Sequence, residues 1–273
     1  MASEAKEQNV NRYMPKRFKL PSPPMILITI GGLILFILGL GSMEMSVDRF
    51  FSGIVNMFHF IISAFPPDLE RLQTALVAMY ETFQIALVGT VFGVILSLPI
   101  ALLASRNTTP HPAIGYVAKG FISLLRTVPD LIWALIFVIS VGLGPFPGML
   151  TIMVDTIGFC GRFFSERIEE MEKGPIEAVQ STGSNQTGVI FGSVLPLGVP
   201  SFVGTSLFAV EKAIRGAVVL GLVGAGGIGV ELSVAMTMRQ FDEALMMILL
   251  ILVVVIIVEQ CSTYIRKKFI ANA

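Results

Sequence analysis

Long apolar stretches separated by short polar segments dominate the pattern of this chain. A helix that crosses ~30 Å of hydrocarbon at ~1.5 Å per residue needs about 20 mostly apolar residues. Six stretches come close to that length: 25–42, 72–104, 128–143, 147–165, 194–222 and 241–265. The pattern therefore predicts an all-α, polytopic membrane protein with about six spanning helices.

The composition supports a bilayer as the solvent of this protein. Hydrophobic residues make up 54% of the 273 residues and charged residues only 14%, whereas soluble domains carry about a quarter charged residues. The formal net charge is zero, so nothing indicates nucleic acid as a partner. Cys160 and Cys261 lie in or beside apolar stretches without metal-ligand spacing, and we interpret them as packing residues.

The distribution of Lys and Arg predicts the orientation in the membrane. If the amino terminus is cytoplasmic, most basic residues fall in cytoplasmic segments, and only Arg49, Arg71 and Arg239 fall on the other side. We therefore expect residues 1–24 to be a cytoplasmic tail, residues 25–273 to be the transmembrane domain, and both termini to be cytoplasmic. The Met25–Leu40 run resembles a signal peptide core, but no clear cleavage site follows it, which favours a retained helix.

Two segments outside the spans have their own pattern. Residues 43–68 are rich in Phe among polar residues, which predicts an amphipathic segment at the outer interface, or a short re-entrant piece instead. The loop at about 166–192 is charged, yet Ile176, Val179 and Thr182 recur at helical spacing before Gly183. This predicts a short helix outside the membrane whose apolar face is covered.

That loop carries a recognisable motif. Glu177-Ala178 followed by Gly183, with Leu195-Pro196 twelve residues further on, resembles the cytoplasmic signature of ABC importer permeases. Val179 stands where the family has a second alanine, and Ser193 where an apolar residue is common. The resemblance implies a coupling helix that docks on an ATPase subunit, with a turn at Gly183 and a helix start set by Pro196. An ordinary amphipathic loop between helices is the alternative.

A second resemblance covers about residues 123–232. Its motifs are Leu125–Leu135, Gly142–Gly148, Glu211–Arg215 and Val219–Gly229, which look like the permease of phosphonate importers and their phosphite and hypophosphite relatives. It implies a type I permease fold in a bacterial inner membrane, a homodimer, two ATPase subunits and a periplasmic substrate-binding protein. ATP and Mg²⁺ would be bound by the ATPase, and this chain would carry no cofactor and no catalytic residue. Ala213 stands where a polar residue is expected.

One motif points elsewhere. Gly224–Gly229 satisfies the G-x-G-x-x-G pattern of dinucleotide-binding proteins, and the preceding Val218–Leu220 could be a strand. That function requires a βαβ unit, but another apolar span follows Asp242. We expect these glycines to allow close backbone packing or a kink near the outer mouth.

Charged residues inside an apolar stretch are the candidates for substrate contact. Glu211, Lys212 and Arg215 lie within residues 202–223, where each charge costs at least ~2.5–3.5 kcal/mol unless it faces a cavity or a partner. We expect Arg215 or Lys212 to present positive potential to an oxyanion. The alternative is a structural Glu211–Arg215 pair at i, i+4. Arg126 is a further candidate, with an interfacial anchor as its alternative.

Two other classes of protein remain as rivals. An ATPase-independent secondary transporter or channel for small anions would leave the coupling segment without a partner. A membrane enzyme acting on lipid phosphate would need clustered His, Asp or Ser at a membrane surface, which the sequence does not show.

Overall fold

The computed structural model describes residues 22–42 and 47–271, and the described residues form helices without a strand. The predicted tail, residues 1–24, therefore lies outside the described residues except for its last three. The chain divides into two compact units, residues 1–59 and 60–273, which are considered separately. The all-α prediction is confirmed.

The first unit contains α2 (Pro23–Ser42) and most of α3 (Val47–Ser63). All residues of α2 are exposed within this chain except Gly31 and Gly39, which are half-buried. The run of Ile, Leu and Phe in α2 matches the first predicted span. In α3, Phe50, Phe51 and Phe58 alternate with polar residues such as Asp48 and Asn56. The segment predicted to be amphipathic is thus a helix of 17 residues.

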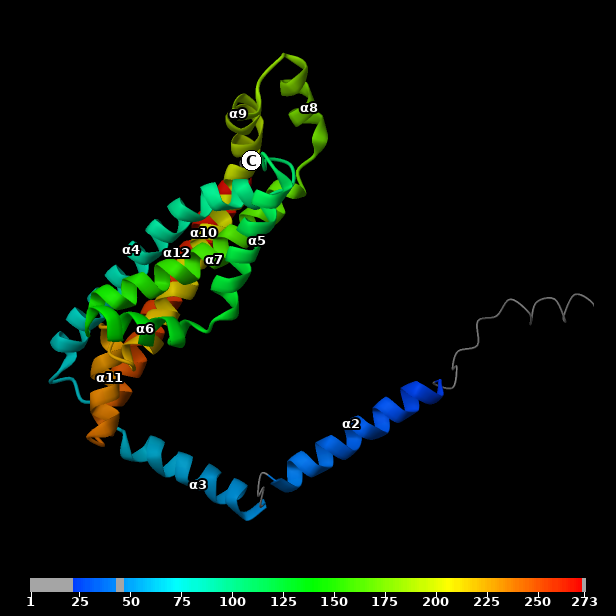
Figure 1. Cartoon of the computed structure of the whole chain (residues 1–273). Helices are drawn as coiled ribbons and strands as arrows, with labels where there is room; N and C mark the ends of the chain where they lie inside the picture. The colour runs from blue at the N-terminus through cyan, green and yellow to red at the C-terminus, as the bar shows by residue number, and fades with distance from the viewer. Residues whose placement is uncertain (1–21, 43–46, 272–273) are drawn as a thin grey trace, which may run out of the picture. The chain divides into compact units, whose positions relative to one another are not determined.

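The second unit is a helical bundle (Figure 1). Its elements are α4 (Leu72–Ala104), α5 (Pro112–Thr127), α6 (Asp130–Val141), α7 (Pro145–Glu169), α8 (Lys173–Ser181), α9 (Gln186–Val189), the π turn η1 (Ile190–Val194), α10 (Leu195–Gly221), α11 (Ile228–Thr237) and α12 (Phe241–Ala271). Helix α7 packs against α4, α5, α6 and α10, and is therefore the central helix of the bundle.

Small residues let α4 approach α7 closely. A Cβ atom on Gly89 would lie 2.8 Å from the Cβ of Ile152, and one on Gly93 would lie 2.5 Å from the Cβ of Thr156. Neither distance leaves room for a side chain, so the Gly89-x-x-x-Gly93 spacing is required by the packing. Close packing through such pairs replaces the hydrophobic effect as the main attraction between helices in lipid.

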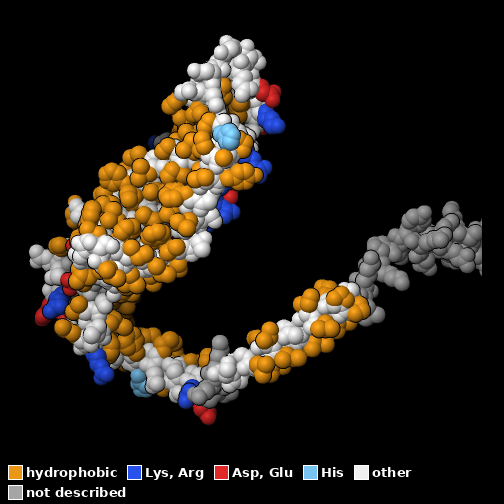
Figure 2. Space-filling view, viewed as in Figure 1, with side chains coloured by type: hydrophobic (Ala, Val, Ile, Leu, Met, Phe, Trp, Pro, Cys, Tyr) orange, Lys and Arg blue, Asp and Glu red, His pale blue; other side chains and the backbone are white. Residues whose placement is uncertain are grey.

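Two clusters of buried side chains fill the bundle. The first includes Ile214, Leu220, Ile228 and Met247, and the second, towards α8, includes Phe164, Ile168, Val194 and Phe202. Cys160 is buried in the second cluster, as expected of a packing residue, whereas Cys261 is exposed on α12. Figure 2 shows hydrophobic side chains over most of the visible face of the bundle, with charged side chains towards its ends and along one edge.

Four described helices are long and apolar enough to cross a membrane, and five if α5 and α6 together form one bent span. They are α2, α4, the continuous helix Gln186–Gly221 and α12. The sequence predicted six. The stretch 128–143 proves to be α6, with 12 residues, which meets α5 at an angle of 88°. The stretch 147–165 lies in α7, the central helix of the bundle. Helix α7 is more polar than the four candidate spans and contains Asp155 and Arg162.

Pro196 lies in the first turn of α10, where the sequence predicted a helix start. The helix does not start afresh there, however, because α9, the π turn and α10 form one continuous helical run of 36 residues from Gln186 to Gly221. Asn185 caps the start of this run, and its side chain accepts a hydrogen bond from the Gly188 N–H at 2.8 Å. Pro196 follows directly on the π turn, in which the Leu195 N–H bonds to the Ile190 carbonyl. Prolines and π turns are both recognised irregularities of long helices.

Candidate functional site

The segment α8 lies beyond the end of the bundle, next to α9 (Figure 1). It has no buried residue, and Glu177 and Ala178 are exposed. Gly183 follows it at φ +79°, a left-handed conformation that glycine adopts without strain. The helix, the turn and the exposure of the motif residues agree with a surface offered to another protein.

The apolar face of α8 is only partly available to a partner. Ile176 and Val179 are half-buried and pack against the second core cluster of the bundle. The sequence predicted that this face would need a cover, and the chain itself supplies part of it. The surface that remains exposed includes Glu177, Ala178 and Ser181.

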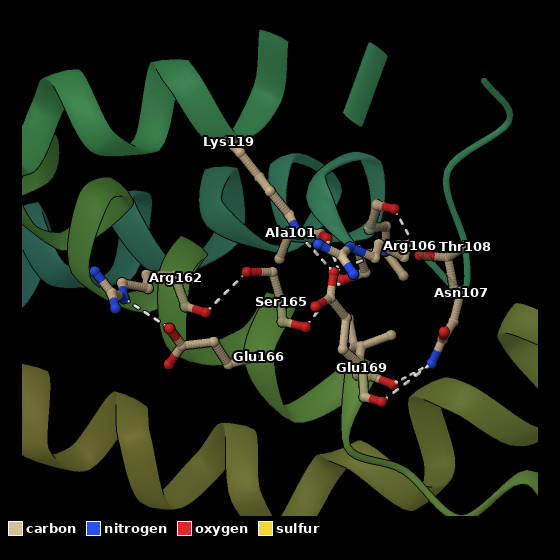
Figure 3. A network of polar contacts seen from close by, with 12 residues as sticks. Ala101, Arg106, Asn107, Thr108, Lys119, Arg162, Ser165, Glu166 and Glu169 are labelled. Atoms are coloured by element: carbon tan, nitrogen blue, oxygen red, sulfur yellow. Dashed lines mark hydrogen bonds and ion pairs between the residues drawn. The ribbon is translucent and has the colours of Figure 1, made fainter. Parts of the chain in front are cut away.

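A polar network holds the base of this segment in place (Figure 3). The Arg106 N–H donates to the Glu169 carboxylate at 2.9 Å, and the Lys119 ammonium pairs with the same carboxylate at 2.8 Å. The Asn107 amide donates to the Ile168 carbonyl at 3.0 Å. These contacts join the α4–α5 loop and α5 to the last turn of α7, directly before α8.

The other end of the segment is tied to the same loop. The Gln186 side chain, in the first turn of α9, donates to the Thr108 carbonyl at 2.8 Å. The chain between Glu170 and Asn185, which includes α8, is therefore anchored at both ends on residues 105–108. The sequence analysis did not find these anchors, although the polar run Ser105–Thr109 after a long apolar stretch was a usable signal.

The Glu169 carboxyl is the electrostatic centre of the network. Burial alone would raise its pKa, but the hydrogen bonds from Lys119 and from the Arg106 N–H outweigh that effect and lower the pKa. The ionised carboxylate is thus the form that the fold selects.

The charged residues of α10 have partners on two different helices. The Glu211 carboxylate, which is buried, binds the Arg266 guanidinium of α12 at 2.9 Å. The Lys212 ammonium binds both oxygens of Asp155 on α7, at 2.6 and 2.7 Å, and lies 5.3 Å from the centre of the Phe159 ring. Arg215 is exposed and makes no ion pair in the part of the chain that the structure describes.

The alternative in which Glu211 and Arg215 neutralise each other is therefore not what the structure shows. Both residues lie on α10, but Glu211 is buried and paired with Arg266 of α12, whereas Arg215 is exposed. Of the predicted pathway residues on α10, Arg215 makes no ion pair among the described residues, whereas Lys212 and Glu211 are neutralised by Asp155 and Arg266.

Arg126 lies apart from these residues, in the last turn of α5. Together with Lys119, Arg162, Glu166 and Glu169 it lines a cavity of about 490 Å³ between α5 and α7. Its side-chain stem packs closely on Gly158, and among the described residues it makes no ion pair. The structure records no contact between Arg126 and the charged residues of α10.

The glycine-rich stretch is a helix entry. Val218–Leu220 belongs to α10 and is not a strand. The Gly227 N–H donates to the Glu81 carboxylate at 3.1 Å and the Ile228 N–H to the Thr82 hydroxyl at 2.8 Å, so the donors at the start of α11 are already occupied by α4. A Cβ atom on Gly226 would lie 2.9 Å from Pro145, which confirms close backbone packing here.

Comparison with known proteins places this architecture. Residues 93–270 match the family described as binding-protein-dependent transport system inner membrane component. The phosphite transport system permease protein PtxC of Stutzerimonas stutzeri is 35% identical over 206 residues, which cover 76% of this chain and 75% of that protein. The phosphate-import permease protein PhnE of Mycolicibacterium smegmatis is 37% identical over 206 residues, and this chain spans 39% of its length.

The fold is similar to that of solved importers. An inward-facing structure of the MetNI methionine ABC transporter matches with a TM-score of 0.65 and 19% identity, covering 73% of this chain and 98% of the matched chain. A crystal structure of an amino acid ABC transporter matches with a TM-score of 0.58 and 16% identity, covering 82% and 100%. The helical architecture and the family match agree, and the chain belongs to the binding-protein-dependent transport system inner membrane components, the membrane-spanning permease subunits of ABC importers.

Proposed function

We propose that this chain carries phosphorus oxyanions such as phosphonate, phosphite or hypophosphite across a bacterial inner membrane. In this proposal two copies of the chain form the pathway, two ATPase subunits bind ATP and Mg²⁺ and dock on the α8 segments, and a periplasmic protein delivers the substrate. The chain itself performs no chemistry. It converts a movement at α8 into alternating access of the pathway.

The double anchoring of α8 is the observation that supports this proposal most strongly. Lys119, Asn107 and Gln186 tie both ends of the segment to the α4–α5 loop and the end of α7, while α8 itself stays exposed. A subunit driven by a separate ATPase requires an exposed and anchored docking segment of this kind, whereas a self-sufficient transporter or channel does not require one.

Two further observations support the substrate class. The relatives named above are permeases for phosphite and phosphate. Arg215 and Arg126 are exposed cations without an ion pair among the described residues, and a guanidinium matches the geometry of a pair of phosphoryl oxygens. Contact with a transported anion must be weak, and an exposed Arg in a partly hydrated pathway satisfies that condition.

Reconstitution would test the proposed function. The chain, its ATPase and its binding protein are incorporated into liposomes, and uptake of radiolabelled phosphite and methylphosphonate is measured with and without ATP. We expect uptake to require ATP and the binding protein, and to stop when the ATPase carries an inactivating substitution. Uptake that continued with the inactive ATPase would instead establish the secondary transporter or channel.

A further inference from the structure

A second cavity, distinct from the one beside Arg126, lies between α7, α10 and α12. Its volume is about 570 Å³, and its lining includes Arg167, Arg266, Ser201, Phe159, Phe163 and Phe208. Arg167 is near the end of α7, Ser201 is in the second turn of α10 and Arg266 is near the end of α12. The cavity therefore lies in the half of the bundle that is next to α8 (Figure 1).

The cavity has unused hydrogen-bond donors and positive charge. Arg167 is exposed and makes no ion pair among the described residues. Arg266 also lines the cavity, but one of its terminal nitrogens already binds Glu211, and its Nε–H is closed to solvent. The Ser201 hydroxyl also has no protein partner in the described part of the chain. Arg167 and the Ser201 hydroxyl are therefore the donors of this cavity that stay available to a ligand.

Aromatic rings form the other wall. The centroids of Phe159 and Phe163 are 4.8 Å apart, and those of Phe159 and Phe208 are 5.7 Å apart. The cavity thus offers cationic donors on one side and an apolar surface on the other. This combination fits a compact anion that bears a small apolar group.

The cavity and Arg215 lie on the same face of α10. Ser201, Thr205, Phe208, Lys212 and Arg215 follow one another at spacings of four, three, four and three residues, which keeps them on one side of a helix. Each of them is half-buried or exposed in the protomer. Ser201 and Arg215 are fourteen positions apart, which corresponds to about 21 Å along the helix axis.

We propose that this cavity binds a tetrahedral phosphorus oxyanion, with Arg167 and Ser201 as direct donors and Arg266 held in place by Glu211. The assignment of this cavity to the pathway of the transported anion rests on the proposed function. An anion that passes Arg215 would reach it at the α8 end of the same α10 face, and its apolar substituent would face the phenylalanines. The same chemistry would accept the phosphate of a phospholipid headgroup, and the experiment must separate these two sources.

Binding to the complete permease–ATPase complex, without the binding protein, tests the site. Methylphosphonate is titrated up to millimolar concentration and followed by ³¹P line broadening. We expect Arg167→Gln to weaken binding about tenfold, which is ~1.4 kcal/mol, and Ser201→Ala to weaken it less. Arg162→Gln is the matched control, because Arg162 is on the same helix but lines the other cavity. Thermal stability and basal ATP hydrolysis confirm that each variant is folded.

Lipid retention supplies the second arm of the experiment. Phospholipid bound to wild-type complex and lost from Arg167→Gln, with methylphosphonate unable to compete, would assign the oxyanion site to a headgroup. Binding of methylphosphonate that only Arg167→Gln and Ser201→Ala weaken would assign it to the substrate. If neither ligand binds, or if the variants bind as wild type does, the cavity is not an oxyanion site. Normal ATP-dependent uptake in that case would leave the proposed function intact.

Discussion

Glu211 and Lys212 are neighbours in the sequence, but their side chains leave α10 towards different helices. Glu211 binds Arg266 on α12, whereas Lys212 binds Asp155 on α7. Asp155 and Glu211 thereby each gain a cation from another helix, which limits the cost of placing these two acids in an apolar environment. These pairs also fix the rotation of α10 relative to both neighbours.

The Lys212–Asp155 pair can be tested as a structural element. Lys212→Met leaves Asp155 without an ion pair and should lower the free energy of unfolding by about 1–2 kcal/mol, less than the 3–5 kcal/mol of a fully buried pair because Lys212 is partly exposed. Adding Asp155→Asn should recover most of that loss. Thermal unfolding in detergent measures both effects, and a double variant no more stable than the single one would contradict the pairing.

The lowered pKa of Glu169 predicts that the stability of the fold depends on pH. Its pKa is lowered in the folded protein, because hydrogen bonds from Lys119 and the Arg106 N–H outweigh the effect of burial. In this pH range the folded state therefore binds fewer protons than the unfolded state. The contribution of Glu169 to folding stability is fully present above its unfolded pKa of about 4.3, and it is lost as the pH falls through its lower folded pKa.

The measurement is a series of thermal unfolding curves between about pH 3 and 7. Glu169→Gln should be less stable than wild type at neutral pH, and the difference should shrink on acidification. Glu170→Gln is the control, since Glu170 is the exposed neighbour. A constant difference between wild type and Glu169→Gln across the series would show that the charge of Glu169 does not contribute.

At the scale of elements, α8 combines an exposed helix with a rigid base. The network around Glu169 and the bond from Gln186 to Thr108 hold its ends, and Gly183 forms the turn that brings the chain back to α9. A Cβ atom on Gly183 would meet nothing within 4 Å, so the requirement for glycine comes from its φ angle and not from crowding.

Gly183→Ala should therefore change coupling while leaving the bundle folded. An alanine at φ +79° costs roughly 1–2 kcal/mol, which corresponds to a factor of about 5–30 in the population of the native turn. We expect uptake to fall by about that factor while the complex still reaches the membrane and hydrolyses ATP at its basal rate.

Gly174→Ala is the matched control for that variant. Gly174 lies in α8 with ordinary helical geometry and open space around it, so the added methyl group creates no strain. Substrate-stimulated hydrolysis and uptake at wild-type levels in Gly183→Ala would mean that this turn has no role in coupling.

At the scale of the whole molecule, the charged ends of the second unit predict its orientation. The carboxyl end of α12 lies at the same end of the bundle as α8 and α9, whereas α11 lies at the opposite end (Figure 1). Lys267 and Lys268 are exposed near the end of α12. An excess of basic residues marks the cytoplasmic side, so we expect α8 and the carboxyl terminus to be cytoplasmic.

Labelling of intact cells with a membrane-impermeant thiol reagent tests this orientation. In a chain with Cys261→Ser, Lys173→Cys should react only after the cells are permeabilised, whereas Met238→Cys, at the exposed end of α11, should react at once. Cys160 is buried and should stay silent in both experiments. Ready labelling of Lys173→Cys in intact cells would reverse the predicted orientation.

The sequence alone determined the class, the main helices, and the short helix and turn around Glu177 and Gly183. Runs such as 72–104 and 241–265 are read directly from hydropathy, because in lipid the backbone must satisfy its own hydrogen bonds and apolar length sets the span. The motif around Glu177 and Gly183 indicated a helix and a turn, because both depend on local backbone preferences.

Tertiary structure decided which charges are neutralised and which remain free. Arg266 and Asp155 lie 55 and 57 residues from their partners Glu211 and Lys212, so helical spacing gave no indication of either pair. Helical spacing suggested Arg215 as the ion-pair partner of Glu211, because periodicity relates residues only within one helix. The anchors of α8 and the cavity lined by Arg167 and Arg266 likewise join separate helices, and their contacts depend on how those helices rotate and pack against one another.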